Sequence, residues 1–164
     1  MDAIQNRQYI SCVLNAENGN EASVFIKPGN GHKKVVGIGA GIAGLEAARG
    51  AAKRGYEVEV YDKAQAIGGQ ILIAAVPPRK SEILRAVEYY EKVLPMLGVA
   101  VHLGKEPDAQ TLNQADAVIA AVGAQNVTLP VPGADLEHVV SAWDILAGEK
   151  TVSGRCAVIG GGLV

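Results

Sequence analysis

Residues 35–48 read VVGIGAGIAGLEAA, and this stretch decides the fold of the chain. The apolar run Val35–Ile38 suits a short buried strand. Glycines follow at positions 39, 41 and 44, in the spacing G-x-G-x-x-G. Residues 45–54 have a small-residue face and a basic end, which predicts a helix, and residues 57–61 alternate like a second strand. Together these segments predict one β-α-β unit of roughly 30 residues.

The three glycines and the acid that follows them fit a dinucleotide site. Gly39 permits a sharp turn, Gly41 lets a pyrophosphate contact the backbone, and Gly44 lets helix and strand pack closely. The pyrophosphate would meet free N–H groups at the positive end of the helix. Asp62 ends the second strand where an acid accepts hydrogen bonds from ribose hydroxyls, and its charge disfavours the 2′-phosphate of NADP. The alternative is a glycine-rich turn in an ordinary α/β unit with a solvated acid.

The rest of the chain continues to alternate helical and strand patterns. Ser81 opens a helix whose apolar residues share one face, namely Ile83, Val87, Tyr90, Leu94 and Leu97. The further elements expected are strands at 99–103, 116–122 and 156–159 and a short helix at Ala142–Leu146. The last strand and its glycine turn repeat the pattern of residues 38–41. We therefore expect a Rossmann-like open parallel sheet with helices on both sides, truncated at the start of a second Rossmann unit.

Composition excludes several other classes. Net charge is −2 and aromatic residues make up 4%, so the basic patches and stacking surfaces typical of nucleic-acid binding are missing, and a membrane-surface role is disfavoured too. No stretch approaches the roughly 18 apolar residues of a membrane-spanning helix. The two cysteines form neither a disulfide framework nor a C-x-x-C pair, which indicates a reducing, cytoplasmic compartment.

Several motifs resemble those of known flavoproteins. The glycine loop, VYDK at 60–63 and IGGQ at 67–70 are similar to the FAD domain of flavoproteins that bind two dinucleotides. Other segments resemble the C-terminal half of the 2,4-dienoyl-CoA reductase, enoate reductase and trimethylamine dehydrogenase group, which are old-yellow-enzyme relatives. These segments are AAVPPRK at 74–80, AAVGA at 120–124, PVPG at 130–133 and VSAWDIL at 140–146. The resemblance covers nearly the whole chain and implies a sheet of the two-dinucleotide-binding flavoprotein type.

The resemblance implies a domain order. An FMN-bearing barrel and an iron–sulfur segment precede an FAD domain, into which an NAD(P)H domain is inserted. Residues 1–31 would be the connecting tail of the iron–sulfur region, 32–127 the FAD-binding domain, and 128–164 the connection and first strand of the NAD(P)H-binding domain. Cys12 stands where the family has the last cysteine of a four-iron four-sulfur cluster. One cysteine cannot hold such a cluster, so a ligand role requires that upstream cysteines be restored.

The resemblance also assigns residues to the nucleotide cofactors. They are Gly39, Ala40, Gly41, Ala43, Gly44, Asp62, Lys63, Gly68, Gly69, Gln70, Gly123, Gly160 and Gly162. No catalytic residue and no metal ligand set is expected in the chain, because the cofactors carry the chemistry. Two positions depart from the pattern: Val122 replaces a frequent threonine, and Asp62 stands where related flavoproteins more often have glutamate. Cys156 lies within an apolar run and is expected to be a buried small hydrophobe.

The implied function is an FAD-binding portion of an NAD(P)H-dependent oxidoreductase, which passes electrons through FAD and an iron–sulfur centre to FMN. Its partners would be nucleotide cofactors and the missing barrel and NAD(P)H domains. The final substrate, the choice between NADH and NADPH, and the oligomeric state stay open. Three alternatives remain. They are a nicotinamide-binding Rossmann module, against which Gly68 and Gly69 argue, a holder of ADP alone, and an inactive fragment.

Overall fold

The computed structural model of the chain describes residues 6, 12, 14–127 and 130–160. It divides into two compact units, Met1–Ala124 and Gln125–Val164. The expected assignment of 32–127 to FAD binding and of 128–164 to an NAD(P)H domain stays a prediction. The two units are described separately below.

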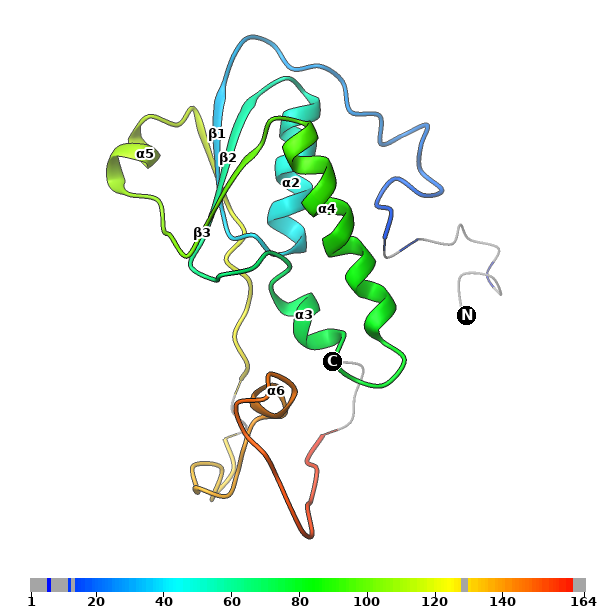
Figure 1. Cartoon of the computed structure of the whole chain (residues 1–164), viewed down its shortest axis with the longest axis vertical. Coiled ribbons are helices and arrows are strands. Elements are labelled where there is room, and N and C mark those ends of the chain that lie inside the picture. The colour runs from blue at the N-terminus through cyan, green and yellow to red at the C-terminus, as the bar shows by residue number, and fades with distance from the viewer. Residues whose placement is uncertain (1–5, 7–11, 13, 128–129, 161–164) are drawn as a thin grey trace. The chain divides into compact units, whose positions relative to one another are not determined.

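The first unit contains a four-stranded, all-parallel sheet in the order β3-β2-β1-β4 (Figure 1). Its strands are β1 (Lys34–Ile38), β2 (Glu57–Asp62), β3 (Ala100–Leu103) and β4 (Ala117–Ala120). The chain moves outward from β1 to β3 and then crosses to the other side of β1. This reversal of direction lies between β1 and β4. In open α/β sheets, ligands bind outside the carboxyl ends of the strands at such a switch point.

Helices cover both faces of this sheet, as predicted. Helices α2 (Ile42–Lys53) and α4 (Arg85–Met96) lie together on one face, and the short α5 (Ala109–Asn113) lies on the other (Figure 1). Two further short elements, α3 (Gln70–Ala74) and the 3-10 turn η1 (Ser81–Leu84), connect β2 to α4. The expected Rossmann-like α/β sheet is thus confirmed.

The core lies between the sheet and the α2–α4 layer. Its largest fully buried side chains are Leu45, Leu94, Val36 and Val60. Helix α2 presents small residues to the strands, which lets it approach the sheet closely, and α4 buries the apolar face predicted from its spacing. Burial of these side chains fixes α2, and so fixes the glycine loop that precedes it.

The predicted elements have the following outcomes in the structure. The helix expected from Ser81 starts as η1 and becomes α4 at Arg85, while the strands expected at 99–103 and 116–122 form the shorter β3 and β4. In the second unit, α6 (Ala142–Leu146) forms where it was predicted, and the Ser141 hydroxyl accepts a hydrogen bond from the Trp143 N–H.

The strand predicted at 156–159 is wrong. Residues 155–160 have no strand assignment, and Val158 and Ile159 are 87% and 75% exposed. Cys156 is exposed as well, so the expectation that it is buried is also wrong. The physical reason is that a strand needs a neighbour to complete its hydrogen bonds. None of the residues described between 125 and 160 forms a strand that could pair with it.

Candidate dinucleotide-binding site

The glycine loop turns sharply from β1 into α2, and two of its glycines have no room for a side chain. Gly39 has a φ of 104°, and a Cβ there would collide with the carbonyl oxygen of Ala121. A Cβ on Gly44 would collide with the Gly39 carbonyl oxygen. Gly41 differs, because no atom outside its immediate neighbours lies within 4 Å of the Cβ position. The loop is therefore tightly packed on the protein side and open at Gly41.

The open side of the loop faces the start of α2. Gly41 is the N-cap of this helix and has no side chain to cap it, and the first turn contains no acidic residue. The first N–H groups of an α-helix lack partners within the helix, and the helix dipole makes this end positive. Free space at Gly41 and uncapped donors together form a cradle of the kind that a pyrophosphate fills. The residues present thus fit a dinucleotide.

Asp62 lies at the end of β2, next to this cradle. One of its carboxylate oxygens accepts a hydrogen bond from the Ala40 N–H at 2.6 Å, and the other accepts one from the Ala64 N–H at 2.8 Å. The sequence indicated a ribose contact for this acid, but it did not indicate that Asp62 fastens the glycine loop to β2. An ionised carboxylate has about four acceptor positions, so Asp62 retains acceptor positions beyond these two hydrogen bonds.

The Gly68-Gly69 pair lies directly against the glycine loop. The Gly68 N–H donates to the Ala40 carbonyl at 2.8 Å, and Gly68 forms a parallel bridge with Gly41. Both glycines have positive φ angles, 112° and 57°. A Cβ on Gly69 would lie 3.1 Å from the Gly41 Cα, closer than side chains normally approach backbone. These glycines therefore allow a second loop to lie beside the first.

A third loop, after β4, completes the edge of the sheet. The Ala121 N–H donates to the Ile38 carbonyl at 2.8 Å, and Gly123 follows with a φ of 80°. The Gln70 side-chain amide donates to the Ala124 carbonyl at 2.9 Å. Acid, glycine loop and post-β4 loop thus stand in the order β2, β1, β4 across the carboxyl edge of the sheet. A dinucleotide spanning a switch point lies along this line.

The remaining predicted residues differ in their surroundings. Ala40 is a buried residue of the glycine loop, and Ala43 and Lys63 are exposed. Gly160 belongs to the second unit, where it has a φ of 102° and is exposed. Gly162 lies outside the described residues. Cofactor roles for all the predicted positions stay predictions.

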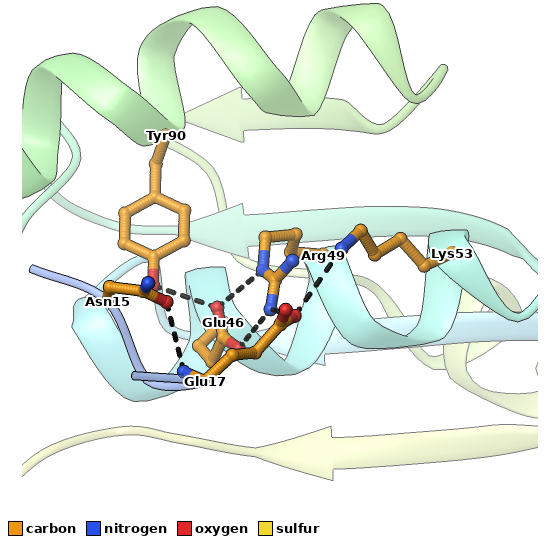
Figure 2. A network of polar contacts seen from close by, with 6 residues as sticks. All are labelled: Asn15, Glu17, Glu46, Arg49, Lys53 and Tyr90. Atoms are coloured by element: carbon orange, nitrogen blue, oxygen red, sulfur yellow. Dashed lines mark hydrogen bonds and ion pairs between the residues drawn. The ribbon is translucent and has the colours of Figure 1, made fainter. Parts of the chain in front are cut away.

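Sequence reasoning missed a polar cluster that joins α2, α4 and the segment around Glu17 (Figure 2). Arg49 is 4% exposed, and its guanidinium donates to Glu46 at 2.7 Å and to Glu17 at 2.8 Å. The Tyr90 hydroxyl donates to Glu46 at 2.9 Å. Burial and then the Glu46 carboxylate raise the pKa of Tyr90, which keeps it a neutral donor. The only local signal in the sequence is the E-x-x-R spacing of Glu46 and Arg49, since Glu17 is 32 positions away.

Two negative findings bear on the other expected cofactors. No group of three or more His, Cys, Asp or Glu side chains in the described part of the chain is arranged to hold a metal ion. Cys12 offers a single exposed thiol, which does not fit a cluster that needs four ligands.

None of the helices in the described ranges is long and apolar enough to cross a membrane.

Fold and loop geometry together define a dinucleotide-binding domain of the Rossmann type. Residues 33–164 match the pyridine nucleotide-disulphide oxidoreductase family, and the chain belongs to that family. Its sequence contains no C-x-x-C pair.

Similar proteins include several reductases. Bilirubin reductase of Mediterraneibacter gnavus is 50% identical over 165 residues, which cover 99% of this chain and 26% of that protein. Cinnamate reductase of Clostridium sporogenes is 38% identical over 166 residues, which cover 100% of this chain and 25% of that protein. A solved structure of 2-naphthoyl-CoA reductase with 2-naphthoyl-CoA aligns with a TM-score of 0.83 and 28% identity, over 92% of this chain and 24% of that one. The resemblance to flavoprotein reductases is confirmed, and the chain spans about a quarter of these relatives.

Proposed function

We propose that this chain is the FAD-binding portion of an NAD(P)H-dependent flavin oxidoreductase. The observation that carries the proposal is the meeting of three glycine-bearing loops at one edge of the sheet, through Gly41, Gly68 and Gly123. A nicotinamide site needs only the first loop for its ADP half. The second and third loops extend the open backbone surface further, as the longer FAD requires.

Different residues would contact different parts of the cofactor. Asp62 would accept hydrogen bonds from the adenosine ribose, and the backbone at Gly41 with the start of α2 would hold the pyrophosphate. Gly69 and Gly123 would let the main chain lie close to the remaining part of the FAD. Bound FAD accepts a hydride from a nicotinamide and releases electrons singly or in pairs. The chain's own contribution is binding and orientation.

The finer assignments extend this proposal to a longer parent protein. Residues 128–164 would lead into an NAD(P)H domain, and electrons leaving FAD would reach FMN in a barrel through a four-iron four-sulfur cluster. The reductases similar to this chain are about four times its length, which leaves room for such domains. A cytoplasmic location, expected from the cysteine content, belongs to the same proposal.

Isothermal titration of the purified chain with FAD, ADP and NADH tests the proposed ligand. We expect FAD to bind more tightly than ADP, because the second and third loops contact only the part that ADP lacks. Equal affinities for FAD and ADP would mean that the site holds the ADP half alone. Tighter binding of NADH than of FAD would identify a nicotinamide site and refute the proposal.

A further inference from the structure

Gln70 connects two loops of the site that are far apart in the sequence. It is the first residue of α3 and directly follows the Gly68-Gly69 pair. Its side-chain Nε2 donates to the main-chain carbonyl of Ala124 at 2.9 Å, across 54 positions of sequence. One N–H of the side-chain amide is therefore bonded within the protein, whereas the sequence suggested a direct contact with the cofactor, which stays a prediction.

The Gln70 hydrogen bond holds a segment that has little else to hold it. Backbone pairing of β4 with β1 ends at Ala121, whose N–H donates to Ile38. Within the described part of the chain, no backbone hydrogen bond involves residues 122–124. Val122 is 76% exposed, so packing does not fix the segment either. The hydrogen bond from the Gln70 side chain to Ala124 thus sets the position of this loop.

The hydrogen bond between Gln70 and Ala124 lies at the end of the site opposite Asp62. A Cβ on Gly123 would be 3.6 Å from the Gln70 Nε2, so the glycine with its φ of 80° runs beside the glutamine. Asp62 is at the end of β2, whereas Gly123 follows β4, with β1 between these two strands. Contacts near Gly123 therefore concern the part of a dinucleotide beyond its ADP half.

We propose that Gln70 is a positioning residue that holds the post-β4 loop, residues 122–124, in place for the flavin half of the cofactor. It acts through the Ala124 carbonyl and not by touching the cofactor. Its loss lowers the affinity for FAD while the affinity for ADP stays the same. This inference rests on the proposed function, because it takes FAD as the ligand.

Two variants and a control test the proposal. Gln70→Leu removes the donor, and Gln70→Glu places a carboxylate against the Ala124 carbonyl. Gln110→Leu makes the same change at an exposed glutamine of α5, outside the three loops. One neutral hydrogen bond corresponds to roughly a two- to tenfold change in affinity. We expect that loss for FAD with Gln70→Leu, a larger loss with Gln70→Glu, and none with Gln110→Leu.

Backbone order parameters from nitrogen-15 relaxation provide a readout that needs no ligand. In the free protein, the order parameters of residues 122–124 should be lower in Gln70→Leu than in the wild type or in Gln110→Leu. Unchanged order parameters overturn the proposal, because Gln70 then does not hold the loop. Lower order parameters with an unchanged ratio of FAD to ADP affinity also overturn it. A wild-type protein that binds FAD no more tightly than ADP refutes the proposed function itself, whatever the order parameters show.

Discussion

The Asp62 carboxylate accepts a hydrogen bond from the Ala40 N–H at 2.6 Å, and this contact joins the end of β2 to the loop that follows β1. The same carboxylate caps the Ala64 N–H in the next turn. Asp62 therefore has a structural role before any ligand arrives, in addition to its expected contact with ribose. The shorter aspartate brings its oxygens close to the main chain, where the hydrogen bond to the loop forms.

Asp62→Ala should lower both stability and nucleotide affinity. The Ala40 N–H, in a buried residue, loses its acceptor, which costs about 1–3 kcal/mol in the free energy of unfolding. Urea unfolding followed by circular dichroism measures this loss. Asp135→Ala is the control, because Asp135 is exposed in the second unit, and its change should stay within about 0.5 kcal/mol. A loss of ADP affinity with unchanged stability would show that Asp62 serves the ligand alone.

Gly41→Val should abolish dinucleotide binding while leaving the fold intact. Gly41 has a φ of −74°, which any residue adopts, and no protein atom lies near its Cβ position. The valine side chain would occupy the space expected for the pyrophosphate. Titration with FAD and ADP should give no measurable binding, and urea unfolding should stay close to that of the wild type. Unchanged affinity would mean that the pyrophosphate does not bind at this loop.

Gly39→Ala, in contrast to Gly41→Val, should lower the stability of the fold. The φ of 104° disfavours any side chain, and the new methyl would collide with the Ala121 carbonyl. Strain of this kind costs on the order of 1–3 kcal/mol, and the collision adds to it. The urea midpoint should fall clearly below that of Gly41→Val. Equal stability of the two variants would mean that the turn relaxes without cost.

The sequence predicted those features that short-range spacing encodes. The glycines between Val35–Ile38 and α2 encode a β-α-β unit, because each glycine serves a need that arises within a few residues. Helix α2 begins at Ile42, before the predicted start at residue 45, since the helix follows immediately after the turn. The boundary depends on how the loop folds onto the sheet, which spacing alone does not specify.

Other features depend on contacts between remote segments. The apolar run 156–159 has the same kind of composition as 35–38, yet only the latter forms a strand, because it has neighbours on both sides. The contact of Glu17 with Arg49 and that of Gln70 with Ala124 join segments 32 and 54 positions apart. Local pattern carries no signal for such pairs.

The polar cluster of Figure 2 predicts a loss of stability in acid. The hydrogen bond from Arg49 holds the pKa of Glu17 below its usual 4.5. Burial alone would raise the pKa of Glu46, but hydrogen bonds from Arg49 and Tyr90 outweigh burial and lower it. A depressed carboxyl pKa adds stability above the unfolded pKa, and this stability disappears as pH falls through the folded pKa. The loss should therefore occur below about pH 4.5.

The urea midpoint, measured from pH 6 to pH 3, checks this prediction. Glu17→Gln should lower the midpoint at pH 6 and make its fall with decreasing pH shallower. Glu91→Gln, a change at an exposed glutamate of α4, should leave the profile as in the wild type. If the profiles of all three proteins coincide, the contact between Glu17 and Arg49 contributes nothing to stability.

The turn between α3 and η1 contains the one described non-glycine residue with a positive φ, Arg79 at 65°. This left-handed conformation costs an L-residue roughly 1–2 kcal/mol, and glycine adopts it freely. Glycine also adds about 0.5–1 kcal/mol of unfolded-state entropy, so Arg79→Gly should be neutral or stabilising by up to about 1.5 kcal/mol. Lys80→Gly is the matched control, because Lys80 is also exposed, carries the same charge and has an ordinary φ of −103°. That control should be destabilised by about 0.5–1 kcal/mol. If both variants lose stability equally in urea unfolding, the positive φ of Arg79 is not a strained feature of the folded protein.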